Sequence, residues 1–216
     1  MNKILLSSAI LLLLFSCKHE PSVSPTKICY SSQIQPLLNS FCGECHSSNS
    51  EGEGNELLVD SYEHLVQSEL VKAGKPFKSP LYNAIVQQNK IAPNYIPPSH
   101  YARLSTNQTN LILQWILQGA ENTNCDTLPC DTANTSYANT IAPIINNNCI
   151  GCHSITTPSG GIVLSSYASI KAIVNNGQLK ASVIDRSSTP MPPTYTINAC
   201  SINQLNNWIN NGMPEN

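Results

Sequence analysis

The sequence has little charge, few aromatic residues and only weak strand patterns. Charged residues make up 11% of its 216 residues, aromatic residues make up 6%, and the formal net charge is −2. No long run of Lys or Arg occurs, so nucleic acid is not an expected partner. The length allows one large domain or two small ones. Because 6% aromatics is thin for two small cores, a large buried prosthetic group would make up for the shortage.

The N-terminal segment has an apolar run, Ile4 to Phe15, that is too short to span a bilayer as a mature helix. Lys3 precedes this run, and the sequence Leu14-Phe15-Ser16-Cys17 ends it. The segment resembles the lipobox of bacterial lipoproteins. That resemblance implies a signal peptide at residues 1–16, lipidation of Cys17, a polar tether at residues 17–27 and a membrane anchor made of acyl chains. The alternative is an ordinary signal peptide that contains a cysteine.

The remainder of the chain contains two copies of one unit. In the first copy, Tyr30-x3-Ile34-x-Pro36-Leu37 leads into Cys42-Gly43-Glu44-Cys45-His46. In the second copy, Tyr137-x3-Ile141-x-Pro143-Ile144 leads with identical spacing into Cys149-Ile150-Gly151-Cys152-His153. Both copies close with Trp-Ile-x-x-Gly, at residues 115–119 and 208–212. A repeat of this length predicts two structural units of the same kind.

Each copy has the apolar period of an α-helix. Ile34, Leu37, Leu38 and Phe41 recur at helical spacing before the first C-x-x-C-H motif, and Ile141, Ile144 and Ile145 do so before the second. The closing helices are predicted to begin after the N-caps Ser105 and Asn198 and to end before Gly119 and Gly212. We therefore expect a mainly α fold.

The C-x-x-C-H motif has a direct chemical reason. Two thiols add across the two vinyl groups of one haem, and the adjacent histidine supplies the proximal nitrogen to iron. With nine Cys and five His in the chain, roughly 0.01 such matches are expected by chance. A zinc site would use paired C-x-x-C units, and a thioredoxin-type motif would need a βαβ context. We therefore expect two covalently bound haem c groups, one at Cys42, Cys45 and His46 and one at Cys149, Cys152 and His153.

The chain resembles bacterial c-type cytochromes. The resemblance rests on the helix before each motif, the string Met191-Pro192-Pro193 and the Trp-Ile-x-x-Gly helix, which are similar to small class I cytochrome c domains. More narrowly, they resemble the cytochrome-c-like domains of bacterial lipoproteins and of planctomycete-type surface cytochromes. The resemblance implies two tandem helical haem domains, at residues 28–122 and 135–216, joined by a linker at residues 123–134.

The distal iron ligand is expected to differ between the two copies. In the second copy Met191 follows the haem motif in a Pro-rich loop, and Met/His ligation raises the reduction potential relative to His/His. The alternative is that Met191 only fills a gap in the core. In the first copy Ile96 stands at the matching position, and isoleucine cannot bind iron.

The first copy therefore leaves its sixth ligand open. His100 in the same loop is the leading candidate, although it is equally consistent with an ordinary surface histidine. A second option is a five-coordinate iron that is open to a small ligand. The remaining candidates are His64, which fits a solvated helix position better, together with Tyr95 and Lys90.

Four cysteines lie outside the lipid site and the two haem motifs. They are Cys29, Cys125, Cys130 and Cys200. Thiols oxidise outside the cytoplasm, and each copy has one of these cysteines near its start and one near its last helix. We propose the pairs Cys29–Cys125 and Cys130–Cys200, each stabilising a small domain by about 2–4 kcal/mol. A local Cys125–Cys130 link is the main alternative.

These features predict a dihaem lipoprotein cytochrome that carries single electrons between redox proteins of the bacterial cell envelope. It would be lipid-anchored and would face the periplasm or the outer surface. If the first haem has two histidine ligands, its potential should be the lower one, and electrons would pass from it to the second haem. An electron carrier is favoured over an enzyme. The alternative is a peroxidase-like haem enzyme or a small-ligand sensor that uses a five-coordinate first haem.

Overall fold

The computed structural model describes residues 27–48, 57–87, 102–125, 129–133 and 135–216. Within these ranges the chain is mainly helical and contains no strand, so the predicted α class is confirmed. None of the described helices is long and apolar enough to cross a bilayer. The predicted signal peptide, the lipidation site Cys17 and most of the tether lie outside the described residues.

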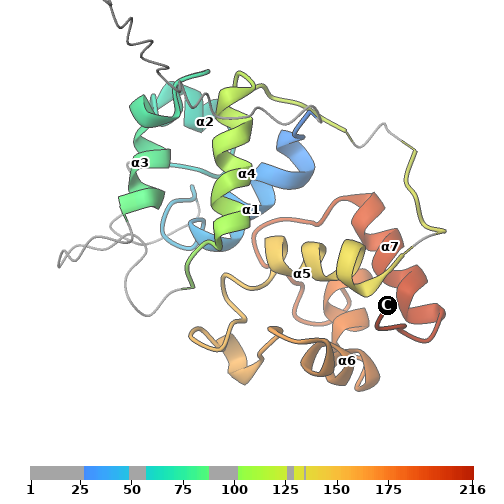
Figure 1. Ribbon diagram of the computed structural model, residues 1–216. Helices are drawn as coiled ribbons and strands as arrows, with labels where there is room; N and C mark the ends of the chain where they lie inside the picture. Colours follow the sequence, from blue (N-terminus) through green and yellow to red (C-terminus); the bar gives the residue numbers. More distant parts are fainter. Residues whose placement is uncertain (1–26, 49–56, 88–101, 126–128, 134) are drawn as a thin grey trace, which may run out of the picture.

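The helices fall into two groups (Figure 1). In the first group the α-helices are α1 (Gln35–Phe41), α2 (Tyr62–Gln67), α3 (Pro80–Val86) and α4 (Thr106–Leu117), with short helical turns at Tyr30–Ile34 and Pro76–Lys78. In the second they are α5 (Ala142–Asn148), α6 (Tyr167–Asn175) and α7 (Ala199–Asn210), with short turns at Tyr137–Ile141, Ser159–Gly161 and Lys180–Ile184. Each group has its own cluster of buried apolar side chains, within residues 28–120 and 141–213.

The helix before each motif buries the apolar stripe that the sequence predicts. Ile34, Leu37 and Leu38 are completely buried, and Ile141 and Ile145 occupy matching buried positions in the second copy. Both helices begin with a wide π-type turn, in which the N–H of Gln35 or Ala142 donates to the carbonyl five residues earlier. Each helix ends directly before the first cysteine of its motif.

The Trp-Ile-x-x-Gly ending makes the same contacts in both copies. Trp115 is 1% exposed and packs against the ring of Tyr30, which meets Tyr62 edge to face, while the fully buried Trp208 packs against Tyr137 and Tyr167. Each indole N–H donates to a backbone carbonyl beyond the helix, at 3.1 Å and 3.0 Å. The repeat read from the sequence is therefore a repeat in three dimensions.

The predicted ends of the closing helices are also present. The Ser105 side chain accepts from the backbone N–H of Gln108, and Asn198 accepts from Ser201 in the same way, so both act as N-caps. Gly119 and Gly212 have φ values of +102° and +82°, the left-handed conformation that ends a helix with little strain in glycine.

Both disulfides proposed from the sequence are present. Cys29 is bonded to Cys125, and Cys130 is bonded to Cys200. The alternative Cys125–Cys130 link is absent, since each of these cysteines has another partner. Each disulfide lies within one copy, and only four residues separate Cys125 from Cys130 along the chain. The segment between the two disulfides is therefore only four residues long.

Candidate functional site

The two C-x-x-C-H motifs fold into the same turn. The backbone N–H of His46 donates to the Cys42 carbonyl at 2.9 Å, and His153 donates to Cys149 at the same distance. The histidine carbonyls then accept from Val59 and Leu164 respectively, each at 2.8 Å. These paired bonds fix each histidine between the end of its helix and the next segment of its own copy.

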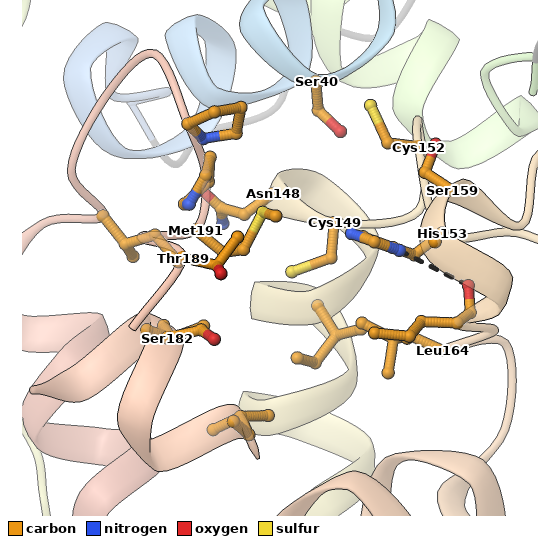
Figure 2. Close-up of a pocket in the computed structure, with 18 of the residues that line it drawn as sticks. Ser40, Asn148, Cys149, Cys152, His153, Ser159, Leu164, Ser182, Thr189 and Met191 are labelled. Carbon is orange, nitrogen blue, oxygen red and sulfur yellow. Dashed lines mark hydrogen bonds between the residues drawn. The ribbon is translucent and has the colours of Figure 1, made fainter. Parts of the chain in front are cut away.

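The second motif faces a cavity of about 670 Å³. Cys149, Cys152, His153 and Met191 all line this cavity, together with apolar side chains that include Ile145, Ile162, Leu164, Leu179, Ile197 and Leu205. In Figure 2, Met191 and His153 lie on either side of Cys149. The volume falls within the range of about 300–1,000 Å³ that is typical of ligand and cofactor pockets. The structure thus brings together all four residues that the sequence assigns to the second site.

The ring of His153 is oriented by a backbone carbonyl. Its Nδ1 lies 3.3 Å from the carbonyl oxygen of Ile162, as the dashed line in Figure 2 shows. A carbonyl oxygen only accepts, so Nδ1 carries the proton and Nε2 keeps its lone pair. Histidines that bind metals are usually held in this way, with one nitrogen on a backbone carbonyl and the other free to coordinate. His153 is therefore prepared to be a ligand through Nε2.

The backbone of Met191 is fixed independently of its side chain. Its N–H donates to the Ser182 carbonyl at 3.0 Å, and its carbonyl accepts from the Arg186 guanidinium at 3.0 Å. A second bond, 3.4 Å long, joins that guanidinium to the Pro192 carbonyl. These contacts hold the loop across the cavity from the motif, so the thioether can face the site without itself maintaining the loop.

The four motif cysteines are free thiols, in contrast to the four that form disulfides. Burial, followed by the neighbouring motif cysteine, raises the pKa of Cys42 and of Cys149 to about 12. Burial also raises the pKa of Cys152, with a further contribution from Glu44. Thiol–disulfide exchange enzymes lower the pKa of their attacking cysteine instead. The environment of these motifs therefore argues against a thioredoxin-type activity.

We expect the thiols of Cys42 and Cys149 to resist alkylation in the folded, haem-free chain. A raised pKa keeps a thiol protonated over a wider pH range, so iodoacetamide should react slowly at pH 7 and faster as the pH approaches 12. The same cysteines in the denatured chain should titrate near the ordinary value of about 8.5. Mass spectrometry of peptides after timed alkylation measures both rates. Rapid reaction of either cysteine at pH 7 in the folded chain would contradict this environment.

Tyr195 is a residue of the second site that the sequence pattern did not predict. Tyr195 lines the cavity, and its hydroxyl lies 3.3 Å from both the carbonyl and the side-chain oxygen of Asn148. Burial raises the pKa of Tyr195 strongly, with smaller effects from Cys149 and Cys152. The available signal was its position, since Tyr195 follows Met191 by four residues as His100 follows Ile96.

The first site is described only in part. His46 and both cysteines of its motif occupy the same turn as their counterparts, but His100, Tyr95, Lys90 and Ile96 lie outside the described residues. His64 lies on α2, and its Nδ1 is 2.5 Å from Asp60 Oδ1. The contact with Asp60 agrees with the expected place of His64 on the helix surface. Because Nδ1 faces Asp60, His64 could reach an iron only through Nε2.

Asp60 receives several hydrogen bonds beside the first motif. Burial raises its pKa, but bonds from Ser48 and from His64 outweigh that effect and leave the pKa below its ordinary value. The backbone N–H of Ser48 donates to this carboxylate at 2.7 Å, and the Ser48 hydroxyl donates to it as well. Asp60 therefore ties the segment after the first motif to the start of α2.

Within the described ranges, no three His, Cys, Asp or Glu side chains come together as ligands for a metal ion. A haem iron needs no such group, because the porphyrin supplies four ligands and the protein adds one or two. Comparisons with protein-family models, curated proteins and solved structures gave no significant match. The chemistry of the two motif sites is therefore the basis for assigning a function.

Proposed function

We propose that this protein is a dihaem c-type cytochrome that carries single electrons between redox proteins of the bacterial cell envelope. The observation that carries the proposal is the second site, where a C-x-x-C-H motif and Met191 line one cavity of about 670 Å³. The orientation of His153 by the Ile162 carbonyl supports it further. Haem bound there would supply an iron that accepts and releases one electron.

Each residue of the second site has a role in this proposal. The Sγ atoms of Cys149 and Cys152 would form the thioether bonds, and His153 would ligate iron through Nε2. Met191 would supply the second protein ligand, and the apolar lining would exclude water and so raise the potential. The two buried clusters would be the cores of haem domains at residues 28–122 and 135–216, joined by the linker at 123–134.

The envelope location is also a proposal. The lipobox-like sequence ending at Cys17 carries it, and this residue lies outside the described ones. Two disulfides support it, because such bonds form and persist mainly in oxidising compartments. Lipidation of Cys17 would hold the protein on a membrane, beside the redox proteins that donate and accept its electrons.

A second candidate function depends on the first site. The first copy contains no methionine, and Ile96 stands in the place of Met191. If no residue replaces that ligand, the first iron would be five-coordinate and could bind a small molecule, as in a haem enzyme or a sensor. If His100 ligates, the first haem would be an electron-transfer group of lower potential than the second.

The haem content tests the main proposal directly. The protein, expressed in a host that attaches haem c, should carry two haems, and Cys149→Ala/Cys152→Ala should carry one. The pyridine haemochrome spectrum counts the haems, and mass spectrometry locates them on the two motifs. Carbon monoxide added to the reduced protein then separates the two functions, because it binds rapidly only to an open iron. A protein with no covalent haem under these conditions would disprove the proposal.

A further inference from the structure

The cavity of the second site has a wall that belongs to the first copy. Ser40, Gly43 and Glu44, which lie in α1 and in the first C-x-x-C-H motif, line the same cavity as Cys152 and His153. In Figure 2, Ser40 points from the blue helix α1 toward this site. The first motif is therefore part of the surroundings of the second.

The closest contact between the copies joins Ser40 to Gly151. The backbone N–H of Gly151 donates to Ser40 Oγ at 3.2 Å. A Cβ atom placed on Gly151 would lie 1.8 Å from the carbonyl oxygen of Ser40 and 2.5 Å from its carbon. Real atoms do not approach so closely, so only glycine permits this contact. Gly151 occupies the second variable position of its motif, where the first motif has Glu44.

Other contacts also hold the two copies together. The helices α1 and α5 pack along one another, and the Gln108 side chain on α4 donates to the Asn146 carbonyl on α5 at 3.0 Å. The short segment between the disulfide-bonded Cys125 and Cys130 limits how far the copies can move apart. We call the contact of α1 with α5, together with the Ser40–Gly151 hydrogen bond, the seam.

Tyr195 reaches the seam from the second copy. Besides lining the large cavity, it lines a small cavity of about 140 Å³ together with Thr194. The other walls of that small cavity are Asn39, Gly43, Ser47 and Asp60 of the first copy. Tyr195 therefore lies between the surroundings of the two motifs.

We propose that the seam couples the two motif sites into one redox unit, in which an electron passes directly from one haem to the other. The inference rests on the proposed function. No bond forms or breaks in this exchange: one iron loses the electron that the other gains. Ser40 and Gly151 set the approach of the two sites, and Tyr195 lies between their surroundings. An electron could thus enter at one copy and leave at the other without a second protein.

The test uses circular dichroism in the Soret region, because two haems in close approach give a paired positive and negative signal that isolated haems lack. Spectra of the single-haem variants Cys42→Ala/Cys45→Ala and Cys149→Ala/Cys152→Ala are added and then subtracted from that of the two-haem protein. We expect a paired difference signal. Gly151→Ala and Ser40→Leu should each reduce it at least twofold, because both force the helices apart. Ala168→Leu, at an exposed position on α6 outside the cavity lining, is the matched control and should leave it unchanged.

Haem counts on every variant keep the two proposals separate. A two-haem protein whose spectrum equals the sum of the single-haem spectra would overturn the coupling while leaving the cytochrome function intact. An unchanged difference signal in both seam variants would overturn the role of the seam. Absence of covalent haem would instead be a failure of the proposed function. If Gly151→Ala lowers haem attachment at its own motif, Ser40→Leu decides the outcome, because Ser40 lies outside both motifs.

Discussion

Replacing Met191 with alanine is expected to convert the proposed second haem from a six-coordinate, low-spin iron to a five-coordinate one. The substitution removes the only thioether among the cavity residues and leaves the backbone bonds to Ser182 and Arg186 in place. The loop should therefore keep its course while the iron loses a ligand. We expect the reduction potential of this haem to fall by a few tenths of a volt. Axial ligands set haem potentials over a range of roughly 0.8 V. Carbon monoxide should also bind to the reduced second haem.

Electron paramagnetic resonance and a redox titration of the two-haem protein measure these changes. Met213→Ala is the matched control, because Met213 packs against the buried cluster of the second copy but is absent from the cavity lining. Met191→His should restore a six-coordinate iron at a lower potential than the original. If Met191→Ala keeps a low-spin second haem with an unchanged potential, Met191 only fills space and the distal ligand is another residue.

The repeated features of the fold could be predicted from the sequence because they depend on local patterns. Helical periodicity identified the buried stripe of α1 and α5, and the cap residues identified both ends of α4 and α7. The disulfide pairs could be proposed because each copy has two cysteines outside its motif, one near its start and one near its last helix. The C-x-x-C-H spacing identified Cys149, Cys152 and His153, the Pro-rich loop and the family resemblance identified Met191, and all four line one cavity.

The contacts between the copies could not be read from the sequence. Ser40 and Gly151 lie 111 positions apart, and nothing in either local sequence indicates that their helices meet. The carbonyl that orients His153 belongs to Ile162. Every residue has a backbone carbonyl, so the type of residue at position 162 could not indicate this role. Residues Pro80–Val86 and Lys180–Ile184 were not predicted as helical, because both segments are short.

Removing the disulfide Cys29–Cys125 with the pair Cys29→Ser/Cys125→Ser is expected to lower the free energy of unfolding by about 4 kcal/mol. The bond closes a loop with a sequence separation of 96, and a loop of about 100 residues gives close to 4.7 kcal/mol in the chain-entropy account. The native contacts near it should persist, because the N–H of Tyr30 still donates to Thr123 Oγ1 at 2.8 Å and Ser31 still donates to the Thr123 carbonyl. Urea unfolding followed by far-ultraviolet circular dichroism measures the loss.

The pair Cys130→Ser/Cys200→Ser is the matched comparison. Its bond has a sequence separation of 70, so its removal should cost about the same. Because the two bonds lie beside separate buried clusters, their effects should add to within about 0.5 kcal/mol. The combined loss of about 8 kcal/mol is comparable to the total stability of about 5–15 kcal/mol that is usual for a domain. A chain without both bonds should therefore be largely unfolded or close to it.

Thioether bonds to haem are not cleaved by thiol reductants, so a reduced wild-type protein should lose stability by the same amount while keeping both haems. A chain as stable without either disulfide as with both would contradict the stabilising role assigned to them.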